Sequence, residues 1–306
     1  MVVTGGAGFI GRAIVSRLAA RGDAVVALVR DPGRAEYLNG NGVKLVASDL
    51  SSQAALTEQM RGADAVIHGA GSYRIGISAA ERPLMYKANV VATERVLDAA
   101  IAAGAPRIVY ISTNNVFGDT HGTEPDETYR RHLAEGWLSY YDATKYRAHE
   151  AAEKRIRTGA PIVIVQPSQV YGPNDHSLAS SQLDLAFHGR LRYITFPTAG
   201  HGWLHVHDLA DGIVAALDRG RIGETYSLAG PSYRLFDAIG VAARVGGWKP
   251  PRLTMPPGLP ANSGEVIRAG DGVTYWARHD KATAELGFNP RSLEQGVADT
   301  WGKAAP

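Results

Sequence analysis

A tyrosine and a lysine stand four residues apart in the stretch YYDATK, at Tyr141 and Lys145. Both fall in SYYDATKYRAHEAAEKR (139–155), which we expect to be helical, so the two side chains would share one helix face. A free phenol has a pKa of about 10, and a neighbouring ammonium lowers that pKa by favouring the phenolate. Tyr141 could then exchange a proton with a carbonyl or alcohol oxygen. The alternative is a solvated surface pair. Tyr140, the rival acid, has Thr144 rather than Lys four residues further on.

A hydroxyl pair, Ser112-Thr113, follows directly on the apolar run that precedes this helix. Ligands of open parallel sheets bind at the carboxyl ends of the strands, which is where these hydroxyls would lie. Thr113 could therefore orient the oxygen that Tyr141 protonates. The three side chains together suit a reaction in which a nicotinamide supplies or accepts a hydride.

A glycine-rich loop, TGGAGFIG (4–11), stands near the start of the chain. Gly5, Gly8 and Gly11 follow a short apolar run and open an amphipathic segment, which is the context of a dinucleotide-binding loop. Glycine permits the tight turn and the close approach of pyrophosphate, and the helix N-terminus offers free N–H groups. A plain glycine-rich turn is the alternative.

The residues after the second predicted strand bear on the choice of cofactor. Arg30 comes first and would pair with a 2′-phosphate, so we expect NADP(H) to be preferred. Asp31 keeps NAD(H) possible, although Asp31-Pro32 could simply start a turn. Asp49 follows the third predicted strand, where it could meet the adenine amino group or cap the helix that begins near Ser51 and Ser52.

Short apolar runs alternate with helical segments over the first 170 residues, which predicts an α/β fold with a doubly wound parallel sheet of the Rossmann type. We expect residues 1–170 to form this dinucleotide-binding domain, and residues 171–306 to form mainly a smaller α+β substrate lobe with some segments returning to the first domain. The predicted strands are 24–29, 43–48, 64–69, 107–112 and 161–166, and then 191–196 and 224–230 in the second half. The predicted helices include 9–20 and 88–104, the latter stopped by Gly104, and the Pro-rich stretch 249–260 is expected to be a loop.

Composition excludes several classes of protein. The 306 residues carry a net charge of +2 with no basic stripe, so we expect no nucleic-acid partner. No apolar run reaches the about 18 residues that span a bilayer, and the first residues do not form a signal peptide, so we expect a cytoplasmic protein without a membrane partner. Cysteine is absent, and although histidines stand at 201, 205 and 207, we expect no metal site.

Several motifs together resemble the extended short-chain dehydrogenase/reductase family, also called the NAD-dependent epimerase/dehydratase family. The resemblance runs nearly from end to end. It is carried by TGGAGFIG (4–11), HGAG (68–71), NVVAT (89–93), ISTNNVFG (111–118), Tyr141-x-x-x-Lys145, QPSQVYGP (166–173), HVHDLADGI (205–213) and AELGFNP (284–290).

The resemblance implies a catalytic set of Thr113, Tyr141 and Lys145. It also implies a homodimer built on segments that correspond to 82–103 and 139–157. The cofactor contacts that we expect, from the residues and from the resemblance together, are Gly5, Gly8, Phe9, Ile10, Gly11, Arg30, Asp49, Leu50, Ala70, Gly71, Asn89, Tyr141, Lys145, Pro167 and Val170.

The departures from the family pattern narrow the activity. Dehydratases of the family follow the catalytic Thr with an Asp-Glu pair, whereas Asn114 and Asn115 stand here, and an amide cannot do that acid–base work. Sugar-nucleotide epimerases use an Arg to hold the diphosphate, but the corresponding stretch AGHGWLHVHD (199–208) has none, and Gln166 replaces a second Arg.

The features LVRDP, Tyr73-Arg74, QPSQVYGPND and GRIGETYSLAG instead resemble the dihydroflavonol-reductase-like and 3β-hydroxysteroid-dehydrogenase-like branch. The predicted function is an NAD(P)(H)-dependent oxidoreductase that reduces a carbonyl or oxidises a secondary alcohol on a small, apolar substrate. The alternatives are an NAD-dependent sugar epimerase and a non-catalytic NADP sensor. The candidate substrate contacts are Tyr73, Asn114 and Trp203, with Tyr193 and Phe196 as further aromatic residues that could line the pocket or simply pack.

Overall fold

Runs of branched apolar side chains build a seven-stranded parallel sheet at the centre of the fold. The computed structural model describes residues 1–40, 42–255 and 264–302, and within them the strand order is β3-β2-β1-β4-β5-β6-β9. Every residue of β5 and β6 is buried, because helices cover both faces of the sheet. The strands are β1 (Val2–Thr4), β2 (Val25–Val29), β3 (Val43–Ala47), β4 (Val66–His68), β5 (Ile108–Ile111), β6 (Ile162–Pro167) and β9 (Thr225–Leu228).

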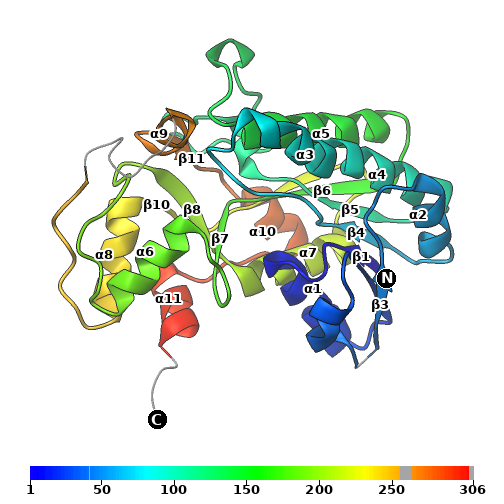
Figure 1. Cartoon of the computed structure of the whole chain (residues 1–306), viewed down its shortest axis with the longest axis horizontal. Helices are drawn as coiled ribbons and strands as arrows, with labels where there is room; N and C mark the ends of the chain where they lie inside the picture. Colours follow the sequence, from blue (N-terminus) through cyan, green and yellow to red (C-terminus); the bar gives the residue numbers. More distant parts are fainter. Residues whose placement is uncertain (41, 256–263, 303–306) are drawn as a thin grey trace.

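Helices form a layer on each face of this sheet (Figure 1). One apolar core joins the sheet to α1, α7 and α10 through residues such as Ile14, Ile213 and Leu286, and a second joins the opposite face to α2, α4 and α5. The helices of the two layers are α1 (Phe9–Ala20), α7 (Val206–Arg219) and α10 (Asp280–Leu286), and α2 (Gln53–Met60), α3 (Arg82–Tyr86), α4 (Ala92–Ala102) and α5 (Tyr140–Arg157). The predicted doubly wound α/β fold is confirmed.

A second lobe is assembled around a four-stranded sheet and its own apolar core (Figure 1). Its strands are β7 (Gln169–Tyr171), β8 (Gly200–His205), β10 (Ser232–Arg234) and β11 (Thr274–Tyr275), and its helices are α6 (Leu178–Phe187), α8 (Leu235–Val245), α9 (Gly264–Gly270) and α11 (Leu293–Trp301). The chain passes repeatedly between the lobes, because α7 packs on the first sheet and β9 pairs with β6.

Most of the predicted elements are confirmed, and the exceptions have local causes. The expected strand at 191–196 is wrong: only Ile194 forms a bridge, to Thr254, and Phe196 adopts a φ of 52°, which ends any extended run. The expected helix 88–104 is the second part of a longer helical stretch, in which α3 leads through a π-helical turn over Lys87–Val91 into α4 at Ala92. Gly104 ends it with a φ of 72°. Part of the predicted loop 249–260 lies outside the described residues.

Within the described residues, no helix combines the length and the apolar character that crossing a bilayer requires.

Candidate active site

In the loop between β1 and α1, the backbone at Gly5 packs closely against the backbone of Ala70 and of Gly11. Gly5 has a φ of 74°, and a Cβ there would lie 2.8 Å from the backbone of Ala70. A Cβ on Gly11 would lie 2.0 Å from the Gly5 carbonyl oxygen. Side chains cannot occupy these positions without moving the loop, so close contact requires both glycines, and the positive φ of Gly5 adds a conformational requirement at that position. The loop ends at Gly8, the N-cap of α1.

This loop lies where the strand order reverses, since β1 has β2 on one side and β4 on the other. Such a switch point leaves a crevice at the carboxyl ends of the strands. Two cavities occupy it, with Gly5, Gly8 and Gly71 in the walls of both. The outer cavity, beside Arg30 and Asp49, has a volume of about 670 Å³. The inner cavity, beside Tyr141 and Lys145, has a volume of about 550 Å³.

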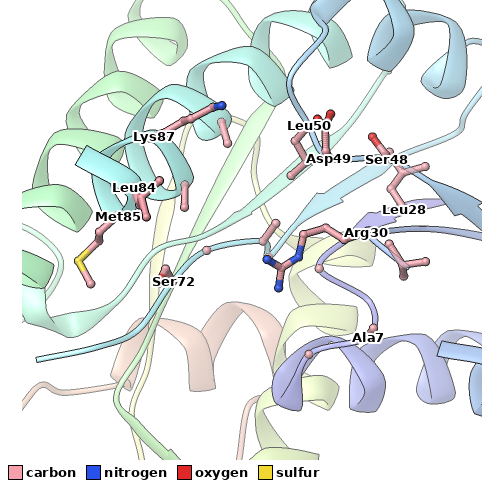
Figure 2. A pocket seen from close by; sticks show the side chains of 18 of the residues that line it. Ala7, Leu28, Arg30, Ser48, Asp49, Leu50, Ser72, Leu84, Met85 and Lys87 are labelled. Carbon is pink, nitrogen blue, oxygen red and sulfur yellow. The ribbon is translucent and has the colours of Figure 1, made fainter. Parts of the chain in front are cut away.

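The outer cavity has an excess of basic side chains. Figure 2 shows Arg30 reaching from the end of β2 into the cavity, with Asp49 and Lys87 on its far walls. Among the described residues Arg30 has no ion pair, whereas Asp31 is paired with Arg34 at 3.7 Å. The charged side chains that line this cavity are Arg30, Arg74, Lys87 and Arg95 against Asp49 and Glu81.

Of the two alternatives for Asp49, the helix cap is wrong, and the contact with the adenine amino group stays a prediction. Its carboxylate accepts the backbone N–H of Ser51 at 2.9 Å, and hydrogen bonding to Ser51 lowers the pKa of Asp49. The cap of α2 itself is Ser52, whose hydroxyl accepts the N–H of Ala55 at 3.3 Å. Asp49 remains exposed and lines the outer cavity, so its carboxylate is also free to meet a ligand.

The predicted cofactor residues all lie around the two cavities. Asn89 differs from the others in that its amide is already engaged: it accepts from the Ser72 N–H at 2.6 Å and donates to Thr144 Oγ1 at 2.9 Å. We conclude that Asn89 holds the loop after β4 in place. The outer cavity is lined by Gly5, Gly8, Arg30, Asp49, Leu50, Ala70 and Gly71, and the inner cavity by Gly5, Gly8, Phe9, Ile10, Gly11, Gly71, Asn89, Tyr141, Lys145, Pro167 and Val170.

The predicted catalytic residues line the inner cavity together. Tyr141 and Lys145 come from the first turns of α5, which Ser139 caps by accepting the N–H of Asp142 at 3.1 Å, and Thr113 follows β5. Lys145 Nζ donates to the Ile111 carbonyl at 3.0 Å and lies 3.4 Å from the Tyr110 hydroxyl.

Burial sets the proton affinities of this pair. It raises the pKa of Tyr141, with the nearby Tyr73 adding to the effect and the Thr113 hydroxyl opposing it. Burial also lowers the pKa of Lys145 to about 8. The expected lowering of the pKa of Tyr141 by Lys145 is therefore outweighed, because desolvation of the phenolate dominates in the protein alone. Burial therefore keeps the Tyr141 hydroxyl neutral.

A hydrogen-bonded chain behind Thr113 escaped the sequence analysis. The Thr113 hydroxyl donates to Asn115 Oδ1 at 3.1 Å, and Asn115 Nδ2 donates to Asp142 Oδ1 at 2.9 Å. Asp142 is fully buried, and its burial raises its pKa to about 6. A carboxylate only accepts hydrogen bonds, so Asp142 fixes the Asn115 amide with Nδ2 toward Asp142 and Oδ1 toward Thr113. The position of Asp142 beside Tyr141 was the one available signal.

The inner cavity continues into a small distal pocket of about 30 Å³, which we define by Tyr73, Ile75, Asn114, His201 and Tyr275. Tyr73 belongs to both spaces, and its ring stands edge-on to that of Tyr141 with centroids 4.8 Å apart. Burial lowers the pKa of His201 to about 4, which keeps it neutral near pH 7. Tyr73 and Asn114 therefore lie where substrate contacts were expected.

Trp203 does not lie there. It is 1% exposed and packs in the core of the second lobe, so its expected role in the substrate pocket is corrected to a packing role. Phe196 is 7% exposed and belongs to the same core. Tyr193 is 46% exposed on the surface of that lobe. The aromatic residues of 193–203 therefore build or cover the lobe, and the distal pocket instead takes Tyr275 from β11, which the sequence gave no reason to select.

Comparison with known proteins gives consistent matches over most of the chain. The sequence pattern of the NAD dependent epimerase/dehydratase family matches residues 1–229. A 4-hydroxy-2-methyl-3-oxo-4-farnesyl-3,4-dihydroquinoline-1-oxide ketoreductase from Stigmatella aurantiaca is 30% identical, over 99% of this chain and 96% of the relative. A protein from Synechocystis named for dihydroflavonol 4-reductase activity is also 30% identical, over 97% of this chain and 92% of its own length.

Solved structures of known proteins also match this chain over nearly its whole length. The crystal structure of a DesIV double mutant, a dTDP-glucose 4,6-dehydratase from Streptomyces venezuelae with NAD and DAU bound, superposes with a TM-score of 0.82 at 26% identity. The match covers 98% of this chain and 95% of that one. Ketoreductases, dihydroflavonol reductases and sugar-nucleotide dehydratases are thus all similar to this chain along its length.

Proposed function

This chain belongs to the NAD dependent epimerase/dehydratase family, and we propose that within it the protein is an oxidoreductase that interconverts a carbonyl group and a secondary alcohol on a small apolar substrate. One observation carries the proposal: Tyr141, Lys145 and Thr113 line a single cavity that also contains the glycine loop. The amides of Asn114 and Asn115 stand beside them, in place of acid–base carboxylates.

The residues of the two cavities fit a nicotinamide dinucleotide. The Gly5–Gly11 loop leaves its backbone open at the N-terminus of α1, where pyrophosphate would be stabilised, and Lys145 is placed to hold the nicotinamide ribose. Arg30 has no ion pair among the described residues and extends into the outer cavity, which favours NADP(H) with its additional phosphate. When bound, the nicotinamide supplies or accepts the hydride.

Tyr141 supplies the proton in the direction of reduction. As a neutral phenol it donates its proton to the carbonyl oxygen, and in the direction of oxidation its phenolate takes the proton of the alcohol. Lys145 stabilises the phenolate that forms, since its ammonium lies one helical turn away in the same cavity. The Thr113 hydroxyl donates to Asn115 and accepts the Asn115 N–H at 3.2 Å, so it faces the cavity as an acceptor. Thr113 therefore orients an O–H group, that of Tyr141 or that of an alcohol.

Among the described residues, the walls of the distal pocket offer no charge that a diphosphate could use, since Asn114, Asn115, Ser168, Gln169 and His201 line it beside apolar side chains. Ile75, Ala269 and the rings of Tyr73 and Tyr275 face it, and within the described residues no lysine or arginine lines it. A sugar nucleotide carries a diphosphate that requires basic partners. Two relatives of this chain are named as a ketoreductase and a dihydroflavonol reductase, and both names support a carbonyl substrate rather than a sugar nucleotide.

A sugar epimerase that retains NAD is the alternative, because it would use the same tyrosine, lysine and threonine. The experiment that separates the two begins with the purified protein, which is denatured so that any released nucleotide can be identified. The untreated protein is then mixed with NADPH or NADH and a panel of apolar ketones and aldehydes. We expect carbonyl-dependent oxidation of NADPH, with the alcohol as product. Tightly held NAD together with no net oxidation of either cofactor would refute the proposal.

A further inference from the structure

The catalytic pair is the start of a longer polar stripe along α5. Tyr141, Lys145, His149 and Glu153 are spaced by four residues, and side chains at that spacing lie above one another on one helix face. His149 is 7% exposed, whereas the side chain of Glu153 at the outer end is 26% exposed. The stripe therefore runs from the inner cavity toward solvent.

Side chains of β5 connect the members of this stripe. Lys145 Nζ donates to the Tyr110 hydroxyl at 3.4 Å. The hydroxyls of Thr93 and Ser112 lie beside that of Tyr110, where they oppose the rise that burial causes in its pKa. Ser112 Oγ lies 2.9 Å from His149 Nδ1, and His149 Nε2 lies 3.4 Å from Glu153 Oε1. Polar side chains thus follow one another from Lys145 through Tyr110, Ser112 and His149 to Glu153 near the surface.

The outer end opens into a separate small cleft. His149 and Glu153 line it together with Arg130, which is paired with Glu153 at 3.3 Å. The cleft has a volume of about 20 Å³, which is room for one water molecule. Ser112 lines the inner cavity instead. The contact between Ser112 and His149 therefore joins two spaces that are otherwise separated by protein.

The proposed reaction, on which this inference rests, needs such a connection. Each reduction adds a hydride to the carbonyl carbon and the Tyr141 proton to its oxygen, so one proton must return from water per turnover. A cofactor and a substrate in the cavities would cover the direct route. We propose that Tyr110, Ser112 and His149 form a relay that carries this proton from the outer cleft to Lys145, which reprotonates Tyr141.

The chemistry of each member suits the transfer. The two hydroxyls both donate and accept, and the imidazole binds a proton at either nitrogen. Water protonates Nε2 in the cleft while Nδ1–H passes its proton to Ser112, Ser112 to Tyr110, and Tyr110 to a neutral Lys145. Burial, which lowers the pKa of Lys145 to about 8, keeps its own proton transferable near neutral pH. No electrons move in these steps.

The first test separates the first turnover from later ones. The first turnover uses the proton already on Tyr141, so His149→Ala and Ser112→Ala should leave its rate unchanged in a rapid-mixing experiment. Steady-state kcat should fall by about tenfold or more. The loss should stay smaller than the about 10²–10⁴-fold loss expected when the general acid itself is removed. Added imidazole should restore steady-state turnover of His149→Ala. The matched control is His188→Ala at the C-cap of α6, where His188 lies 3.2 Å from Asp184, and this variant should behave as the wild type.

Equal losses in the first and later turnovers without imidazole rescue would overturn the relay and leave His149 a packing residue. A second readout needs no substrate. In ¹⁵N-histidine spectra of the protein alone, His149 should show a protonated Nδ1 that donates a hydrogen bond, and this hydrogen bond should disappear in Ser112→Ala. An unchanged His149 signal in that variant would also refute the relay. If Tyr141→Phe kept full activity instead, the proposed function would fail while the histidine spectra still reported on the hydrogen-bonded chain.

Discussion

Arg30 provides a sharp prediction about cofactor choice. Its guanidinium extends into the outer cavity and has no ion pair among the described residues, so a 2′-phosphate would be its partner there. Hydrogen bonds to charged groups contribute about 1.5–3 kcal/mol, and about 1.4 kcal/mol corresponds to a tenfold change in affinity. Arg30→Ala should therefore weaken NADPH binding roughly 10- to 100-fold, toward the lower figure because Arg30 is exposed to solvent.

The assay is a titration of the purified protein with NADPH and with NADH at two salt concentrations. NADH affinity should be almost unchanged in Arg30→Ala, and the salt dependence of NADPH binding should decrease with the loss of the charge pair. Arg34→Ala is the matched control, because Arg34 is 90% exposed and already paired with Asp31. Equal weakening of both cofactors, or a larger effect of Arg34→Ala than of Arg30→Ala, would refute the assignment of Arg30 to the 2′-phosphate.

Three further predictions concern the loop and the buried charges. Gly11→Ala should abolish measurable NADPH binding in the same titration, since its Cβ would lie 2.0 Å from the Gly5 oxygen, whereas Gly33→Ala, whose Cβ meets only a side-chain oxygen at 3.4 Å, should bind normally. Burial raises the folded-state pKa of Asp142 from 3.8 to about 6, so stability present below pH 4 is lost as pH rises through 6. In the wild type, the free energy of unfolding measured with urea should therefore decrease by about 3 kcal/mol as pH rises over this range, and in Asp142→Asn this decrease should be absent. A decrease in Asp142→Asn as steep as in the wild type would contradict the assignment to Asp142. The pKa of Lys145, lowered to about 8, predicts that kcat/KM falls as pH rises through about 8, and a flat profile up to pH 10 would show that its charge is not needed.

The fold could be predicted in segments where a single physical requirement restricts which residue types can occur. Strands β5 and β6 are buried on both faces, so they appear as continuous apolar runs, and the loop at Gly5 and Gly11 admits no side chain. These constraints are local and leave a direct mark on the sequence. The placement of Tyr141, Lys145 and Thr113 around one cavity then follows from the topology, because β5 and α5 meet at the carboxyl edge of the sheet.

The remainder of the site depends on contacts that no local pattern encodes. Asn115 and Asp142 are 27 positions apart, and their hydrogen bond exists only because α5 docks beside the turn after β5. Aromatic residues are common both in substrate pockets and in apolar cores, so the sequence did not show which of these places Trp203 takes. The packing of the second lobe puts it in the core. Tyr275 reaches the distal pocket through β11, whose pairing with β8 spans the second lobe.

Two variants at adjacent positions of α5 would show whether Tyr141 is the proton donor of a carbonyl–alcohol oxidoreductase. Tyr141→Phe and Tyr140→Phe each remove one hydroxyl from the first turn of α5. With a carbonyl substrate and NADPH, turnover of Tyr141→Phe should fall by about 10²–10⁴-fold or more while NADPH binding is retained, and Tyr140→Phe should turn over normally. Normal turnover by Tyr141→Phe would contradict the account.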